Sequence, residues 1–238
     1  MKNIFITPLS WAIEILYWSY NLFSYVFSFI ELKPLTRKTI FILTPTFTGP
    51  FLYRKAKKYL ENKGFNVIIY NFSKEIKDID TSAEKLKKIM DDMNLENVCL
   101  VGISAAGLTT YEYLNKLNGW DRVDTFITIG TPFKGTYMSY FAYHTKIGRR
   151  LIPKSSYIAH IQGIEPQNLN RTYCLVATKD EIVPKESSTL SGAHFVEVPV
   201  LGHVRLHAFS DKTFEIISQI AATPVKLHKK RINLEIFK

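Results

Sequence analysis

Three polar residues, Ser104, Asp180 and His203, are of the types that together can activate a hydroxyl group. Each follows an apolar run, and Ser104 lies in the Gly-Ile-Ser-Ala-Ala-Gly segment of residues 102–107. A serine hydroxyl is a weak nucleophile at neutral pH, but a histidine whose ring is oriented by a carboxylate can take its proton. These residue types therefore predict a nucleophile, a base and an acid, provided that the fold brings them together.

The apolar runs before these residues belong to a regular alternation of strand and helix patterns. Amphipathic segments such as 81–93 and 105–118 separate the runs. This alternation is typical of a mainly parallel sheet of about six strands with helices on both faces, and chemistry then gathers at the carboxyl ends of the strands. The predicted strands are 39–44, 66–70, 98–103, 123–130, 172–177 and 194–200.

Two motifs, together with the chain order of the serine, the aspartate and the histidine, resemble those of the α/β-hydrolases. The Gly-x-Ser turn between a strand and a helix is similar to the family's nucleophile elbow, although Ala106 stands where the family has glycine and Gly107 follows it. The chain order serine, aspartate, histidine is also the family's order. The Thr-Pro-Phe-Lys-Gly-Thr run of residues 131–136 resembles a segment of lipases and of inositol-lipid deacylases. The resemblance implies an α/β-hydrolase domain over residues 39–222.

The resemblance also implies roles for individual residues. Ser104 would be the nucleophile, His203 the base and Asp180 the acid that orients it. The oxyanion hole would use the backbone N–H groups of Ala105 and Phe47. Many lipases carry a His-Gly pair in the loop that holds Phe47, whereas this sequence has Pro-Thr at that point.

Two neighbours of these residues offer the same chemistry. Glu181 is a second carboxylate beside Asp180, but the Asp-x-x-Val-Pro pattern of residues 180–184 resembles the family's acid loop and favours Asp180. His207 lies four residues beyond His203, and we expect it to be structural.

The substrate cleft is expected beside the 131–136 segment. Thr131, Pro132 and Phe133 are the candidates to line it, with an ordinary turn as the alternative. Residues 137–167 break the strand and helix pattern and predict a small helical lid. Its apolar side would contact an acyl chain, and its basic side, which holds Arg149 and Arg150, would contact a phosphate. The alternative is a surface loop that makes no contact with the substrate.

Residues 1–32 are predicted to form a hydrophobic helix that associates with a membrane. The run 4–30 holds nine aromatic residues and one carboxylate, Glu14, and it is long enough to cross a bilayer core of about 30 Å. Polar residues recur at helical spacing, so one face is expected to pack on a helix or on the catalytic domain while the aromatic remainder meets the membrane. The alternative is a helix buried against the domain. The polar residues are Thr7, Ser10, Glu14, Tyr17, Asn21, Ser24 and Ser28.

Charge and composition narrow the choice of partners. The net charge of +10 permits an anionic partner. The sequence holds no zinc-ligand cluster, Walker motif or aromatic-basic RNA signature, so we expect a membrane surface rather than nucleic acid, and no metal or organic cofactor. Basic residues that flank the first helix favour a cytoplasmic catalytic domain. A linker is expected at 33–38 and a basic tail at 223–238, while the oligomeric state is left open.

The sequence thus predicts a membrane-associated serine hydrolase that cleaves carboxylic esters through an acyl-enzyme, and we expect these to be lipid esters. A thioesterase or amidase would use the same residues on another leaving group. A catalytically inactive membrane-docked module is the third reading, suggested by Ala106 and by the missing His-Gly pair.

Overall fold

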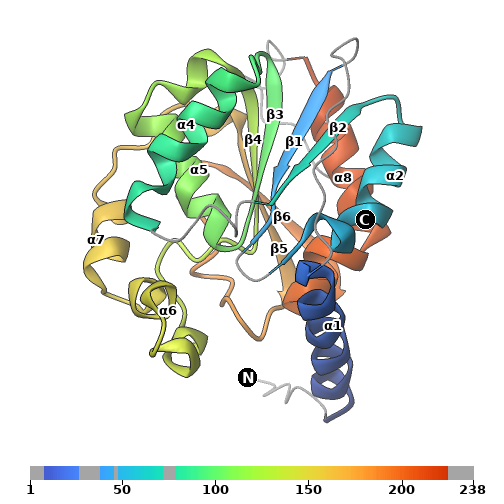
Figure 1. Ribbon diagram of the computed structural model, residues 1–238, viewed down its shortest axis with the longest axis vertical. Helices are drawn as coiled ribbons and strands as arrows, with labels where there is room; N and C mark the ends of the chain where they lie inside the picture. The colour runs from blue at the N-terminus through green and yellow to red at the C-terminus, as the bar shows by residue number, and fades with distance from the viewer. Residues whose placement is uncertain (1–7, 27–37, 46–47, 72–78, 225–238) are drawn as a thin grey trace.

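A parallel sheet forms the centre of the molecule in the computed structural model, which describes residues 8–26, 38–45, 48–71 and 79–224 (Figure 1). Within these ranges six strands pair in the order β2-β1-β3-β4-β5-β6, and every pairing is parallel. This confirms the predicted sheet. The strands are β1 (Thr39–Leu43), β2 (Asn66–Tyr70), β3 (Val98–Ile103), β4 (Val123–Ile129), β5 (Thr172–Lys179) and β6 (His194–Leu201).

The central strands are apolar along nearly their whole length because both faces of the sheet are covered. Every residue of β1 and β3 is buried. Phe41, Leu100 and Phe126 are in register on three adjacent strands and point to one face. The edge strand β6 instead alternates between buried and exposed residues over most of its length. The pattern of each strand thus reports its place in the sheet.

Helices lie on both faces of the sheet, as Figure 1 shows. One face packs on α4 (Ser82–Asp92) and α5 (Ala105–Lys116), with Leu86 and Leu108 in the core. The other face packs on α2 (Arg54–Asn62) and α8 (Asp211–Ala222). The remaining helical turns of the body are η1 (Pro50–Tyr53), η2 (Ile79–Thr81), η3 (Gly119–Asp121), η5 (Leu169–Arg171) and the π-helical η6 (Arg205–Phe209).

The predicted lid region consists of three short helices between β4 and β5. They are η4 (Tyr137–Ala142), α6 (Lys146–Leu151) and α7 (Ser156–Gln162), of which α6 and η4 pack on each other. Thr145 and Ser155 cap α6 and α7 by accepting backbone N–H groups of the first turn. These small capped helices give the lid a defined shape although it contributes no strand to the sheet.

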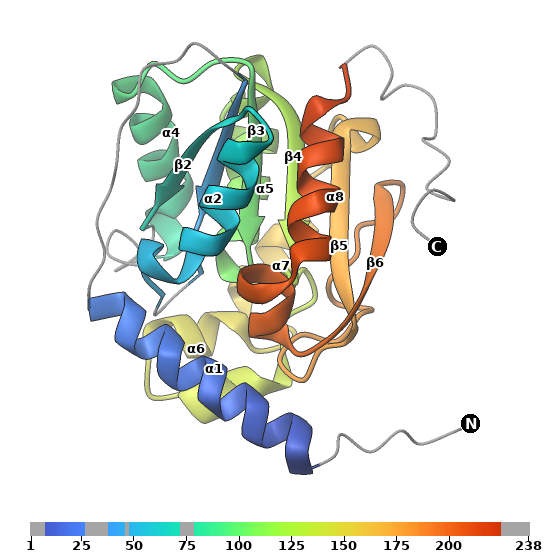
Figure 2. The ribbon, with the colours of Figure 1, turned by 90° about the vertical axis from the view of Figure 1, so that its right-hand side faces the viewer.

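The first helix, α1 (Pro8–Val26), lies across the end of the molecule that also carries α6 (Figure 2). Within the described parts of the chain, no helix is both long and apolar enough to cross a membrane; residues 4–7 and 27–30 of the predicted run lie outside those parts. Side chains of α1 are described for residues 11–20. Two of the predicted polar-face residues are among them: Glu14 is buried, and the ring of Tyr17 stacks on Phe209 at 4.4 Å. Most of the predicted linker and basic tail lies outside the described residues.

Candidate active site

Ser104 occupies a sharp turn between the end of β3 and the start of α5. Its backbone angles, φ 51° and ψ −127°, lie in a region that non-glycine residues rarely adopt. The turn is held by the Ser104 N–H, which donates to the Ile129 carbonyl at 2.9 Å, and by the Gly107 N–H, which donates to the Ser104 carbonyl at 2.9 Å. A strained residue fixed in this way is a frequent feature of functional sites.

Two glycines allow the helix to pass close to the strand behind Ser104. A Cβ atom on Gly102 would lie 2.6 Å from the Cα of Gly107, and one on Gly107 would lie 1.9 Å from Thr131 Oγ1. The close contacts of the turn therefore run through Gly102 and Gly107. Ala106, the departure from the family's motif, is fully buried without interrupting the helix.

Asp180 and His203 form a buried pair at the ends of β5 and β6. Asp180 Oδ2 lies 2.7 Å from His203 Nδ1, and both side chains are 4% exposed. Asp180 Oδ1 accepts the backbone N–H groups of Ile182 at 2.9 Å and Val183 at 2.8 Å. The carboxylate is thus fixed on both oxygens. Because it faces Nδ1, that ring nitrogen carries the proton and Nε2 is left as the basic nitrogen.

The surroundings of His203 set its pKa and its position. Burial acts to lower the pKa, but the charge and hydrogen bond of Asp180, followed by the charge of Glu181, outweigh burial and raise the pKa above the usual value. Gly130, at φ 57°, leaves room for the ring, since a Cβ atom there would lie 2.7 Å from His203 Cε1. The end of β4 is therefore shaped around the His203–Asp180 pair.

The two neighbouring candidates have other partners. Both carboxylate oxygens of Glu181 accept the backbone N–H of His203, each at 3.2 Å, so Glu181 holds the loop rather than the ring. His207 lies in η6 and its Nδ1 is 3.0 Å from the hydroxyl of Tyr53. Burial lowers the pKa of His207 well below its usual value, so it is neutral. Its ring meets that of His203 edge to face at 5.5 Å.

A cavity of about 380 Å³ brings Ser104 and His203 to one space. Its wall is mostly apolar, and Pro132 contributes to it as predicted. Thr131 and Phe133 do not line it: Thr131 packs on Gly107 behind the turn, and Phe133 lies edge to face with Tyr111 in the core. The prediction that all three line the cleft is therefore corrected to Pro132 alone.

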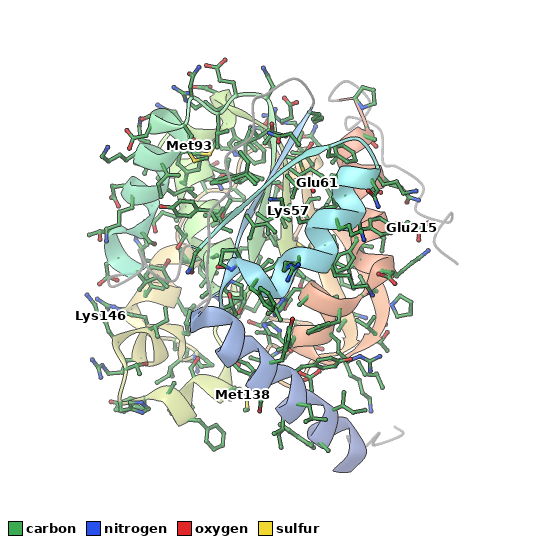
Figure 3. All side chains as sticks on the ribbon, turned by 45° about the vertical axis from the view of Figure 1, so that its right-hand side comes forward. Lys57, Glu61, Met93, Met138, Lys146 and Glu215 are labelled. Carbon is green, nitrogen blue, oxygen red and sulfur yellow. The ribbon has the colours of Figure 1, made fainter. Side chains whose placement is uncertain are left out.

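The lid closes one side of this cavity with apolar groups. Met138, Ile147 and Leu151 line it from η4 and α6, and Figure 3 shows Met138 beside α1. Arg149 and Arg150, the basic residues of the lid that were predicted to meet a phosphate, do not line the cavity. Arg150 binds Asp80 and donates to Ser156 Oγ at 2.8 Å, while Arg149 donates to backbone carbonyls of the lid.

The cavity also has a wall that sequence reasoning missed. Trp11 and Trp18 of α1 line it together with Ser104 and His203. The sequence signal for this wall is Glu14, the one charged residue of an apolar run, which lies between the two tryptophans at helical spacing and so marks the helix face that packs on the domain.

The backbone donors and the buried thiols complete the comparison with the sequence. Ala105 is the first residue of α5 and follows the N-cap Ser104, so its N–H belongs to the free N-terminal turn of the helix. Phe47 lies outside the described residues. Cys99 and Cys174 are free and buried, and burial raises the pKa of Cys99 to about 12. In the described ranges, no group of three or more His, Cys, Asp or Glu residues is placed to hold a metal ion.

The fold is similar to that of solved α/β-hydrolases, whereas no protein-family model and no curated protein matches the sequence. A lipase of Bacillus licheniformis in mature form shares 14% identity at a TM-score of 0.60, covering 81% of this chain and 95% of that one. Lipase B of Aspergillus fumigatus shares 18% identity at a TM-score of 0.64, covering 87% and 59%. A bromoperoxidase of Bacillus anthracis shares 16% at 0.51, covering 79% and 93%. These likenesses concern the fold, which hosts more than one reaction.

Proposed function

We propose that this chain, an α/β-hydrolase by its fold, hydrolyses carboxylic esters with Ser104 as the nucleophile. One observation carries the proposal: the strained Ser104 and the Asp180-bound His203 line the same cavity. A buried aspartate that accepts the Nδ1 proton of a histidine serves to orient that histidine as a base. If Ser104 were only a turn residue and the Asp180–His203 contact only an ion pair, there would be no reason for them to line the same apolar cavity.

The proposed reaction proceeds through an acyl-enzyme. His203 Nε2 takes the proton of Ser104 Oγ while the oxygen attacks the ester carbonyl, and the resulting oxyanion is stabilised by the Ala105 N–H. The bond to the alcohol then breaks, and His203 returns its proton to the departing oxygen. Water, deprotonated by His203, attacks the acyl-enzyme and releases the acid and Ser104. A second oxyanion donor is predicted from the Phe47 N–H.

The character of the cavity supports a lipid ester as the substrate. Side chains such as Met138, Leu151 and Ile182 give the acyl chain an apolar surface. A volume of about 380 Å³ is at the small end of ligand cavities. We therefore propose esters of short to medium acyl chains.

A fluorophosphonate probe tests the nucleophile directly. We expect the wild-type protein to gain the mass of one phosphonyl group, because a base-activated serine attacks phosphorus and the adduct does not hydrolyse readily. The Ser104→Ala variant should gain none. Ser218→Ala, which changes a serine of α8 away from the cavity, should label like the wild type. A correctly folded wild-type protein that stays unlabelled in intact-mass measurements would favour the non-catalytic module.

We also propose that the cavity end of the molecule docks on an anionic lipid surface. Large side chains there are exposed on α1 and on η4, including Leu16 at 69% and Phe141 at 82%. With a net charge of +10, we expect co-sedimentation with vesicles of anionic phospholipid to exceed that with zwitterionic ones. The paired substitution Leu16→Ser and Phe141→Ser should release the protein. Equal binding to both kinds of vesicle would contradict the electrostatic part of this proposal.

A further inference from the structure

The carboxyl group of Glu14 is buried, although the apolar residues next to it on α1 are exposed to solvent. Glu14 is the only charged residue of α1 and is 4% exposed, whereas its neighbours Ile15 and Leu16 are 61% and 69% exposed. Burying a carboxyl group costs free energy unless other groups compensate. The orientation of α1 therefore depends on what Glu14 meets in the catalytic domain.

Glu14 reaches the loop that carries His203. A Cβ atom on Gly202, at φ 103°, would lie 1.7 Å from Glu14 Oε1 and 2.5 Å from its Cδ, so glycine is the residue that admits the carboxyl group. Gly202 directly precedes His203, whose backbone N–H is bound by Glu181. Two carboxyl groups, one from α1 and one from the acid loop, thus meet beside the same histidine.

Two neighbouring carboxyl groups in a buried place cannot both be ionised without cost. Burial first, and then the neighbouring carboxyl group of Glu181, raise the pKa of Glu14 to about 8, against smaller opposite effects of His203 and of the Val204 backbone N–H. Neither oxygen of Glu14 makes a hydrogen bond of regular geometry to a described residue. The other titratable groups at this point are Asp180 and His207, both in contact with His203. At neutral pH Glu14 is therefore the protonated partner.

The helix face that carries Glu14 is also a wall of the cavity. Trp11, Glu14 and Trp18 lie three and four residues apart and share one side of α1. The two tryptophans line the cavity beside Ser104. We propose that α1 is a movable wall of this cavity, latched while the buried carboxyl group of Glu14 beside Gly202 is protonated and released when that proton passes to solvent. The consequence for turnover rests on the proposed ester hydrolysis, whereas the latch does not.

The direction of the pH dependence follows from the two states of α1. In the released helix Glu14 has the usual pKa of 4.5, and in the docked helix its pKa is about 8. Below the lower value both states hold the proton, so docking is strongest there. Between the two values only the docked state holds it, and the docking constant falls by up to about tenfold per pH unit. Above the higher value the constant levels off at its minimum.

Tryptophan fluorescence with acrylamide quenching tests the latch without any turnover. The sequence holds three tryptophans, so a Trp120→Phe background leaves Trp11 and Trp18 as the reporters. We expect the quenching constant to rise by roughly twofold between pH 5 and 9, because these rings are 41% and 38% exposed when docked and released rings are fully exposed. Readings are taken only where far-UV circular dichroism is unchanged.

Matched variants separate the proton from general effects of charge. Glu14→Gln keeps the size and a donor but cannot ionise, so its quenching should stay low and flat across the pH range. Glu165→Gln removes an exposed carboxylate from the loop after α7 and should keep the parent's rise. A flat parent curve, or an unchanged rise in Glu14→Gln, would overturn the latch. If the wild-type protein is not labelled by the fluorophosphonate probe but its quenching constant still rises with pH, the proposed hydrolysis is rejected and the latch is supported.

Discussion

Removing Ser104 and His203 together is expected to slow ester hydrolysis no further than removing either one alone. Each single substitution, Ser104→Ala or His203→Ala, should lower kcat by roughly 10⁴- to 10⁶-fold, because the hydroxyl is inert without the base and the base has nothing to activate without the hydroxyl. Groups that act as one unit lose their whole effect when the first is removed. The residual rate of all three variants then reflects binding and the oxyanion hole.

The measurement is kcat for a soluble short-chain p-nitrophenyl ester, with each variant checked by far-UV circular dichroism. Ser218→Ala and His160→Ala serve as matched controls, since Ser218 lies on α8 and His160 on α7 outside the cavity. Both controls should retain the wild-type kcat. Single variants that keep more than a few per cent of the activity, or a double variant far slower than either, would show that the two side chains do not form one catalytic unit.

The sheet could be predicted from sequence because its strands are short apolar runs with helical patterns between them. In β3 every residue is buried, so the run carries no polar interruption that could be mistaken for a loop. The same logic located Ser104, Asp180 and His203, since each directly follows or nearly follows a strand and parallel strands bring their carboxyl ends to one edge.

The orientation of side chains within loops could not be predicted in the same way. Thr131 and Phe133 were expected to line the cleft, yet Thr131 turns toward Gly107 and Phe133 enters the core. A loop motif gives the path of the chain, but which residue faces the cavity depends on contacts with distant elements. Arg150 illustrates the same point, because its partner Asp80 precedes it by seventy residues.

In the first helix, the hydropathy pattern predicted a face that packs on the domain but did not predict that this face lines the cavity. The run 4–30 is rich in aromatic residues, which favoured lipid, and its polar spacing favoured a packed face. Glu14 and Tyr17 do face the domain. The sequence could not tell that this face closes the cavity, because the groups that receive Glu14 lie near residues 181 and 202, far along the chain.

Replacing Asp180 by asparagine is expected to lower kcat/KM by about 10⁴-fold at its optimum. The asparagine amide can donate to Nδ1 of His203, which places the proton on Nε2 and leaves no base facing the cavity. The change keeps the size of the side chain and its two contacts with the Ile182 and Val183 N–H groups, so the loss would come from the imidazole rather than from the loop.

The pH dependence of the same variant has a defined sign. His203 must be neutral to accept a proton, and Asp180 is the leading reason that its pKa is raised despite burial. The acid limb of kcat/KM should therefore lie above the usual histidine value in the wild type and move to lower pH in Asp180→Asn. Glu181→Gln removes the next contributing carboxylate but keeps the Nδ1 partner, so its limb should move in the same direction by less, with a much smaller loss of rate. An acid limb that stays in place in Asp180→Asn would mean that the rate reports a group other than His203.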